Sequence, residues 1–501
     1  MGPNILLQVI IIPTIVSVIL FIGRHKLGRK AGWITALSLV YTTTLLCYIG
    51  YKATQGIVLK EEYLLIAPDI RLNLVADGLS LPVALIANLL CTVLAFFSIH
   101  YIDHRIEVLY PRAKGKAYSS YYARFFYMFL YFPIGFAGVS LVSNLLALYF
   151  FMEVLTITLY FLMAYFGYIE RQKIAFMCLI WGIAGALLLL AGSSIIYSQT
   201  ESFAFSDIHR IAGNPLAFWV ILITLLGLMT KLAIFPFHVW MPWVHAEHPT
   251  CIAGLLAVYA NIAAYIMVRV LIIPLRADFE VFGTPLLILA LVTMVYGSLL
   301  TMAQTDIKRI AACSTISQIA YSVLGIAALT TVSIEGGLFF FLSHIMGKTI
   351  FFSTAGIVVY TTGFRDIRQL GGLARKMPIT AILWVIGAMM LSGFPPFSSF
   401  TAEWIMFTGI FEHGVQAGPA ALIVAILAVT AILLTAGYTF TAVKKVFFGP
   451  LNSSLTAGNQ HIKDPSLTML LPLFVVVGIS IYLGLFPKIL MNLLHTVTGN
   501  L

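Results

Sequence analysis

The stretch LYFFMEVLTITLYFLMAYF, residues 148–166, decides the fold class of this chain. It belongs to a segment, 143–166, that carries one charged residue, Glu153, and exceeds the ~20 apolar residues that a helix needs to cross a bilayer. The rest of the chain has the same character, since 60% of its 501 residues are hydrophobic and 10% are charged. Soluble domains carry roughly 25% charged residues. The composition therefore excludes a soluble enzyme, a disordered chain and a secreted disulfide scaffold, and it predicts an all-α polytopic membrane protein.

Segments of this kind recur along the whole chain and predict about fourteen transmembrane helices. The first segment has no basic leader and no small-residue cleavage site, so we interpret it as a membrane span and not as a signal peptide. No connection is long enough for a separate soluble domain, and we expect residues 1–501 to form a single transmembrane domain. The expected spans are 3–23, 31–51, 79–101, 122–141, 143–166, 174–197, 216–240, 250–272, 284–304, 307–329, 335–360, 378–408, 420–446 and 468–490.

The charged residues divide between the two sides of the membrane. Twenty of the 29 Lys and Arg residues fall in one set of alternate loops, within residues 24–30, 105–124, 171–173, 308–309, 365–376 and 444–463. Acids gather in the other set, at Glu61, Glu62, Asp69, Glu201, Asp207, Asp278 and Glu280. Cytoplasmic loops carry the excess of Lys and Arg, so we expect a multi-pass protein of the cell membrane with both termini outside. The net charge of +10 then reflects topology and anionic membrane lipids, and not a nucleic-acid partner.

A few ionisable residues remain inside the predicted spans: Glu153, Lys231, Lys348 and Glu403, with His238 and His344. A charge at the centre of a bilayer costs ~2.5–3.5 kcal/mol even on the lenient insertion scale, and such residues form ion pairs or proton relays. A Glu153–Lys231 pair that never moves would only hold helices together. A pair that separates and re-forms would be a proton switch. His344 and Lys348 lie four residues apart and would face the same way on a helix.

Two predicted spans contain proline beside an ionisable residue, in KLAIFPFH (231–238) and GFPPFSSFTAE (393–403). Proline removes a backbone donor, and non-helical backbone at membrane depth persists only where protein or a water-filled cavity satisfies it. Paired interrupted helices in corresponding positions indicate an inverted-repeat transporter. We expect broken helices in the seventh and twelfth spans and two five-helix repeats, residues 122–272 and 284–446.

A cluster of His238, His245, Glu247 and His248 raises the question of a metal site. Zinc does use His and acid ligands, but this spacing fits no closed motif and suits a hydrated exit from a helix equally well. The five cysteines form no CxxC pair, and no GxGxxG or Walker-type phosphate loop occurs. We therefore expect no metal and no cofactor on this chain, and any redox chemistry on a partner chain.

Four motifs resemble one family: TKLAIFPFHVWMPWVHAEHPT (230–250), DIKRIAACSTISQIAYSVLGI (306–326), LSHIMGKTIFF (342–352) and GFPPFSSFTAEW (393–404). They are similar to the antiporter-like subunits shared by respiratory complex I, Mrp-type Na+/H+ antiporters and membrane-bound hydrogenases. The resemblance runs from about residue 77 to residue 450. It implies fourteen helices with two inverted five-helix repeats, in agreement with the expected spans.

The resemblance also implies roles for single residues. Glu153 and Lys231 match the family's glutamate and lysine partners of the fifth and seventh helices. Lys348, with His344 beside it, matches a lysine on the central hydrophilic axis. Glu403 matches a twelfth-helix residue that is Glu in the chain M (mitochondrial chain 4) type, which this chain resembles most.

Two positions depart from the family pattern. Asn261 stands where a connecting lysine is expected, and Gln318 stands where some members have histidine. An amide cannot take up and release a proton. A proton connection from Lys231 to Lys348 would therefore need water or His238.

These observations predict a proton-translocating membrane subunit of a complex I-like NADH/quinone or related oxidoreductase complex. Its proton relay would be Glu153, Lys231, His238, His344, Lys348 and Glu403, and its partners would be other membrane subunits of a complex I-like, Mrp-like or hydrogenase complex. One alternative is a component of an Mrp-type Na+/H+ antiporter, which would move Na+ as well as H+. Another is a structural membrane spacer, for which neutralising Lys231 would leave transport unchanged.

Overall fold

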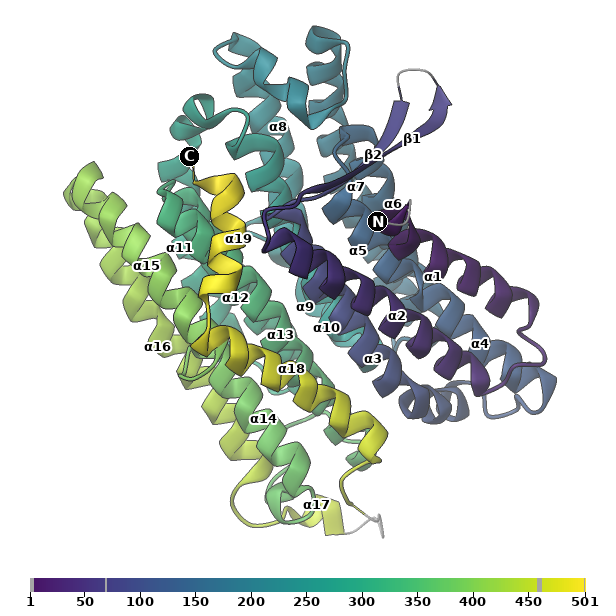
Figure 1. Ribbon diagram of the computed structural model, residues 1–501. Helices are drawn as coiled ribbons and strands as arrows, with labels where there is room; N and C mark the ends of the chain where they lie inside the picture. The colour runs from purple at the N-terminus through teal and green to yellow at the C-terminus, as the bar shows by residue number, and fades with distance from the viewer. Residues whose placement is uncertain (1–3, 68–69, 457–461, 500) are drawn as a thin grey trace. The chain divides into compact units, whose positions relative to one another are not determined.

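The computed structural model describes residues 4–67, 70–456, 462–499 and 501, and its chain folds into two compact units (Figure 1). Unit 1 comprises Met1–Leu232, Ile262–Gly283 and Lys488–Leu501, and unit 2 comprises Ala233–Asn261 and Thr284–Pro487. The chain thus leaves unit 1 directly after Leu232, the residue that follows Lys231. Whether residues 122–272 and 284–446 are inverted repeats stays a prediction.

Unit 1 is built from membrane-length helices and one β-hairpin. Its helices are α1 (Ile5–Ile22), α2 (Lys30–Ala53), α3 (Ser80–Leu109), α4 (Lys116–Phe129), α5 (Tyr131–Leu141), α6 (Leu145–Phe166), α7 (Arg171–Thr200), η1 (Phe205–Ile211), α8 (Pro215–Leu232), η3 (Met267–Ile272) and α19 (Lys488–Thr498). The hairpin of β1 (Leu59–Ala67) and β2 (Ile70–Ala76) pairs Leu59 with Ala76 in antiparallel register. We had expected only a loop here.

Unit 2 contains the remaining helices. They are η2 (Phe237–Trp240), α9 (Met241–Glu247), α12 (Ile307–Ala327), α13 (Thr331–Thr362), η4 (Leu373–Arg375), α14 (Pro378–Leu391), α15 (Ser398–Ala417), α16 (Pro419–Phe447), α17 (Ser453–Thr456) and α18 (Leu467–Leu485). Two further helices, α10 (Thr250–Ile266) and α11 (Arg276–Met302), have residues in both units. The membrane-length stretches of α12 and α13 are wholly buried, so these two helices form the core of unit 2.

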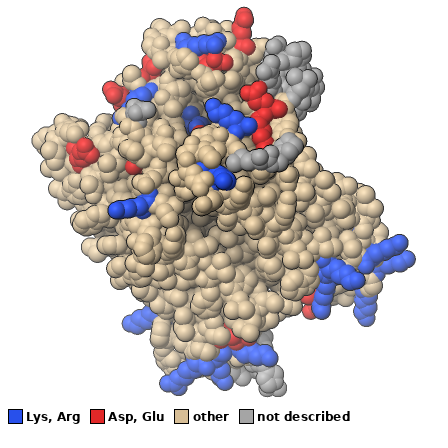
Figure 2. All heavy atoms as spheres, viewed as in Figure 1, with Lys and Arg blue, Asp and Glu red and all other residues tan. Residues whose placement is uncertain are grey.

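Thirteen helical segments within the described residues are long and apolar enough to cross a membrane. The remaining expected span, 378–408, is divided between the short apolar helix α14 and the first half of α15. On the face shown in Figure 2, the sides of the helices carry few charged atoms, and Lys and Arg side chains gather where α1 turns into α2. The prediction of an all-α polytopic membrane protein is confirmed.

Both predicted helix breaks are present. The α-helix of the seventh span ends at Leu232, Ala233 has a φ of +51°, and helical structure resumes at Phe237. In the twelfth span α14 ends at Leu391, Gly393 has a φ of +63°, and α15 begins at Ser398. Proline follows each positive-φ residue within three positions and cannot donate to a helical ladder, which explains the interruptions.

Ion pairs join distant segments within each unit. In unit 1, Arg269 Nη2 lies 2.6 Å from Asp77 Oδ1. In unit 2, Arg365 contacts Asp306 Oδ2 at 2.8 Å and Glu247 Oε1 at 3.1 Å. Asp306 also accepts hydrogen bonds from the backbone amides of the first turn of α12 and so caps that helix.

Candidate functional site

The first group of predicted site residues lies in unit 1. Lys231 is the next-to-last residue of α8 and is 2% exposed, because α8 ends one residue later at the helix break. Glu153 lies in α6, and the two side chains interact electrostatically. Among the described residues, Glu153 Oε1 has no hydrogen-bond partner. The structure therefore brings Glu153 and Lys231 together without holding that carboxylate oxygen in a fixed hydrogen bond.

Small residues place the Lys231 side chain against α7. A Cβ atom added at Gly185 would lie 2.9 Å from the carbonyl oxygen of Gly227 and 3.2 Å from Cγ of Lys231. A Cβ atom at Gly192 would overlap the hydroxyl of Thr224. Glycine at such positions lets the backbones of two membrane helices approach closely. The site in unit 1 therefore depends on the contact between α7 and α8 as well as on its charged groups.

The second group lies in the core of unit 2 around Lys348, which is fully buried. Its Nζ atom donates to the carbonyl oxygen of Ala311 at 3.1 Å and to the hydroxyl of Ser314, both on α12. A buried ammonium group needs such acceptors because its charge has left water. Helix α12 therefore supplies the polar environment of the lysine on α13.

His344 precedes Lys348 by one helical turn and contacts Asn261, at 3.3 Å from Nδ1 to Oδ1. The amide nitrogen of Asn261 donates to the carbonyl oxygen of Ala257 at 2.7 Å, which leaves Oδ1 to accept from the imidazole. This arrangement puts the proton of a neutral His344 on Nδ1, and Nε2 has no partner among the described residues. The amide of Asn261 cannot take up or release a proton, but it orients the His344 ring.

Three further groups, His245, His248 and Lys308, are buried in unit 2, and the sequence analysis had placed none of them in the relay. His245 and His248 are fully buried, and none of their ring nitrogens has a hydrogen-bond partner in the described part of the chain. His245 interacts electrostatically with both Lys348 and His344. Lys308, which we had assigned to a loop, is buried in the first turn of α12 and donates to the carbonyl oxygen of His248 at 2.6 Å. The sequence signal that could have placed Lys308 in a helix was its position two residues after Asp306, the residue that caps α12.

Among the described residues, His238, His245, Glu247 and His248 do not converge as ligands of one metal ion. Glu247 contacts Arg365, and His238 lies 3.3 Å from the hydroxyl of Tyr296 on α11 and stacks on Phe235. No three His, Cys, Asp or Glu side chains converge as metal ligands anywhere in the described ranges. In the described part of the chain, the contacts of His238 do not include another predicted relay residue.

A further set of buried side chains, polar except for Phe340, lies between this region and Glu403. The Phe340 ring stacks on His344 and on Tyr321, whose hydroxyl lies 2.9 Å from Thr435 Oγ1. Gln318 donates to the same Thr435 oxygen at 3.2 Å. Tyr321 interacts electrostatically with Glu403. Within unit 2, the polar groups around Tyr321 therefore extend toward Glu403, and the apolar ring of Phe340 separates them from His344.

Glu403 itself lies at the second helix break. It is 6% exposed, and its Oε1 atom has no hydrogen-bond partner among the described residues. A Cβ atom added at Gly393 would overlap Oε2 of Glu403. The glycine in the break therefore leaves the space that this carboxylate occupies.

The side chains of this arrangement are ionisable groups. Lysine, glutamate and histidine side chains inside a membrane span are typical of proton relays. Glu153 and Lys231 form one set in unit 1, and His344, Lys348 and Glu403 lie in unit 2 with His245 beside them.

Comparison with known proteins gives a family. The model of the family "NADH:quinone oxidoreductase/Mrp antiporter, TM" matches residues 142–435. The chain is 26% identical over 501 residues to F(420)H(2) dehydrogenase subunit M of Methanosarcina mazei, covering 97% of this chain and 95% of that protein. It is 27% identical over 498 residues to a Na(+)/H(+) antiporter protein of Alkalihalophilus pseudofirmus, covering 94% of this chain and 59% of that longer protein.

The fold also matches a solved structure. A chain of the Mrp complex from Dietzia sp. DQ12-45-1b aligns with a TM-score of 0.86 at 20% identity, covering 99% of this chain and 97% of that one. The family model covers more than half of the chain, including the segments that carry Glu153, Lys231 and Lys348. This chain belongs to the NADH:quinone oxidoreductase/Mrp antiporter transmembrane family.

Proposed function

We propose that this chain is a proton-translocating membrane subunit of a complex I-like oxidoreductase complex. The observation that carries the proposal is the Glu153–Lys231 pair. Its lysine is 2% exposed, beside a helix break, and its carboxylate keeps one oxygen without a hydrogen-bond partner among the described residues. A buried lysine beside a carboxylate that is not fully hydrogen-bonded can exchange protons when its surroundings change.

In this proposal the protonation of Lys231 depends on its distance from Glu153. Lys348 takes up and releases protons with His344 beside it, and Glu403 is the last proton carrier. Electron transfer on partner chains drives these changes, and this chain makes no covalent bond and holds no cofactor. Subunit M of the F(420)H(2) dehydrogenase supports an oxidoreductase as the parent complex, and Glu403 supports the chain M type.

The partners in this proposal are other membrane subunits of the parent complex, surrounded by membrane lipids. We place the chain in the cell membrane with both termini outside, because the loops rich in Lys and Arg alternate with acidic ones. The alternative function is a component of an Mrp-type antiporter, which the likeness to the Na(+)/H(+) antiporter protein favours. The two functions differ in their driving force, which is an electron donor for one and an ion gradient for the other.

The test is redox-driven acidification of inverted membrane vesicles that contain the assembled complex, with NADH and F420H2 tried separately as donors. We expect Lys231→Ala to keep electron transfer but to lower the protons moved per electron by at least about ten-fold, because a general acid–base group is removed. Lys444→Ala, at an exposed lysine, is the matched control and should leave that ratio unchanged.

Two other outcomes would contradict the proposal. Normal proton movement in Lys231→Ala would favour the structural spacer. Acidification that needs sodium and no electron donor would favour the antiporter.

A further inference from the structure

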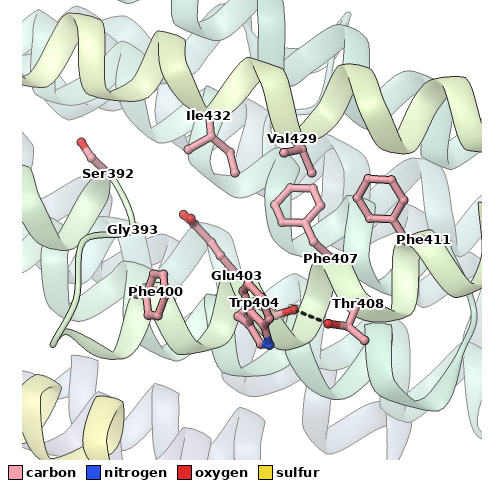
Figure 3. A pocket seen from close by; sticks show the side chains of 10 residues that line it. All are labelled: Ser392, Gly393, Phe400, Glu403, Trp404, Phe407, Thr408, Phe411, Val429 and Ile432. Carbon is pink, nitrogen blue, oxygen red and sulfur yellow. Dashed lines mark hydrogen bonds between the residues drawn. The ribbon is translucent and has the colours of Figure 1, made fainter.

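A cavity opens beside Glu403 on the side of α15 that faces α16. It has a volume of about 600 Å³ and is lined by Ser392, Gly393, Phe400, Glu403, Trp404, Phe407, Thr408, Phe411, Val429 and Ile432. This volume lies within the ~300–1,000 Å³ of ligand pockets. Figure 3 shows the Glu403 carboxylate turned toward Gly393 and Ile432, with Phe407 and Phe411 turned toward Val429.

The two hydroxyl groups of this lining, those of Ser392 and Thr408, already have hydrogen-bond partners. Ser392 Oγ lies 2.8 Å from Thr439 Oγ1, and Thr408 Oγ1 donates to the carbonyl oxygen of Trp404 at 2.8 Å. Glu403 is 6% exposed and keeps Oε1 without a partner in the described part of the chain. The cavity therefore offers one unsatisfied acid in an otherwise apolar space.

Aromatic rings make up most of the remaining wall. Phe407 is buried, whereas Phe400 and Trp404 are 40% and 69% exposed on the outer surface of the described chain. Aromatic faces attract cations, and the attraction increases where water is excluded. An acid surrounded by such rings recognises a positive charge attached to an apolar body.

The geometry points to a binding site for a lipophilic ammonium ion, whose cationic head pairs with Glu403 and whose apolar tail lies along Phe407 and Phe411. The occupant is a free amine and not an aminolipid, because Glu403 follows a break inside a membrane span and a lipid headgroup stays at the membrane surface. Binding does not rest on the proposed function. Its consequence does, because an ammonium ion held on Glu403 would block the last proton carrier.

The test uses a photoreactive diazirine derivative of decylamine and its decanol analogue, added to membranes that contain the full complex. After irradiation, the labelled peptides are mapped by mass spectrometry. We expect the amine to label residues 400–411 and 429–432 about ten-fold more than the alcohol does, and excess decylamine to compete, because a charge-assisted contact is stronger than a neutral one.

Two variants separate charge from shape. Glu403→Gln should lower labelling by the amine to the level of the alcohol, whereas Glu412→Gln, at an exposed acid on the same helix, should leave it unchanged. Ile432→Trp fills the cavity without altering its charge and should exclude both probes. It also tests the site if Glu403→Gln fails to assemble.

Equal labelling by amine and alcohol, or labelling unaffected by Glu403→Gln, would overturn the proposal and leave an apolar groove open to lipid tails. Competition by phosphatidylethanolamine vesicles but not by phosphatidylcholine vesicles would assign the cavity to lipid headgroups instead, which also overturns it. Specific labelling without block of proton movement would retain the binding site and contradict the proposed role of Glu403.

Discussion

Lys348 on α13 donates a hydrogen bond to the carbonyl oxygen of Ala311 on α12, with 3.1 Å between Nζ and the oxygen. The same Nζ atom also donates to the hydroxyl of Ser314, one turn further along α12. Neither acceptor is an acid, so Lys348 lies in a polar site without a carboxylate partner in these contacts. Neutral oxygen atoms of α12 therefore hold the ammonium group in place.

Removing the hydroxyl that contacts Lys348 should slow proton transfer. We expect Ser314→Ala to reduce proton movement by a few-fold, and Lys348→Ala to reduce it by at least about ten-fold, because only the second removes the titrating group. Both are measured in inverted vesicles at matched rates of electron transfer. Ser353→Ala, on the same helix as Lys348 and without a hydrogen-bond partner among the described residues, is the control. An equal loss in Ser314→Ala and Ser353→Ala would contradict the role of this contact.

A side chain at Gly185 should displace Lys231. In Gly185→Ala the new Cβ would lie 2.9 Å from the carbonyl oxygen of Gly227, so α7 and α8 must separate slightly and carry Lys231 with them. We expect the complex to assemble and to lose most of its proton movement per electron. Gly437→Ala has no atom within 4 Å of the new Cβ and should behave as wild type. Unchanged pumping in Gly185→Ala would show that the position of Lys231 tolerates this shift.

The Asp77–Arg269 pair should make stability depend on pH. Burial by itself raises the pKa of Asp77, but the charge and hydrogen bond of Arg269 outweigh burial and lower it. The contribution of the Asp77–Arg269 pair to the free energy of unfolding is therefore complete above the pKa of an unfolded Asp, about 3.9. It is lost as the pH falls through the lower pKa that Asp77 has in the folded protein. We expect Asp77→Asn to lower the free energy of unfolding near pH 7 by roughly 3 kcal/mol, as for other buried pairs.

Thermal unfolding of the solubilised complex, followed from pH 7 down to about 3, measures this difference. The advantage of the wild type over Asp77→Asn should shrink below about pH 4. Glu280→Gln, at an exposed acid, is the control. A difference between wild type and Asp77→Asn that stays constant over this range would rule out the ion pair as its source.

Arg365 and Arg368 provide a matched pair of arginines in one loop. The side chain of Arg365 is 17% exposed and contacts both Asp306 and Glu247, whereas that of Arg368 is 72% exposed and pairs with Asp366. We expect Arg365→Ala to cost roughly 3 kcal/mol of stability, because it leaves two partly buried carboxylates without this cation. Arg368→Ala should have little effect, since exposed pairs contribute little. Equal thermal stability of the two variants would contradict this assignment.

The sequence by itself determined the membrane architecture and the positions of its breaks. Hydropathy over about 20 residues is a local property, so it predicted the spans, and proline beside Lys231 and before Glu403 predicted the two interruptions. The buried charges were also visible, because a charged residue within an apolar run stands out. The β-hairpin was missed because its strands of nine and seven residues are shorter than a membrane span, and hydropathy over about 20 residues does not detect strand pairing.

Only the tertiary structure decided which of these groups meet. His344 contacts Asn261 from 83 residues away, and Arg269 contacts Asp77 from 192 residues away. Lys308 carries the same charge as its loop neighbours, and its contact with His248 depends on how α12 packs. Hydropathy and helix breakers act through neighbouring residues in the chain. The partners of a buried polar group are chosen by helix packing, which brings together residues that no local pattern connects.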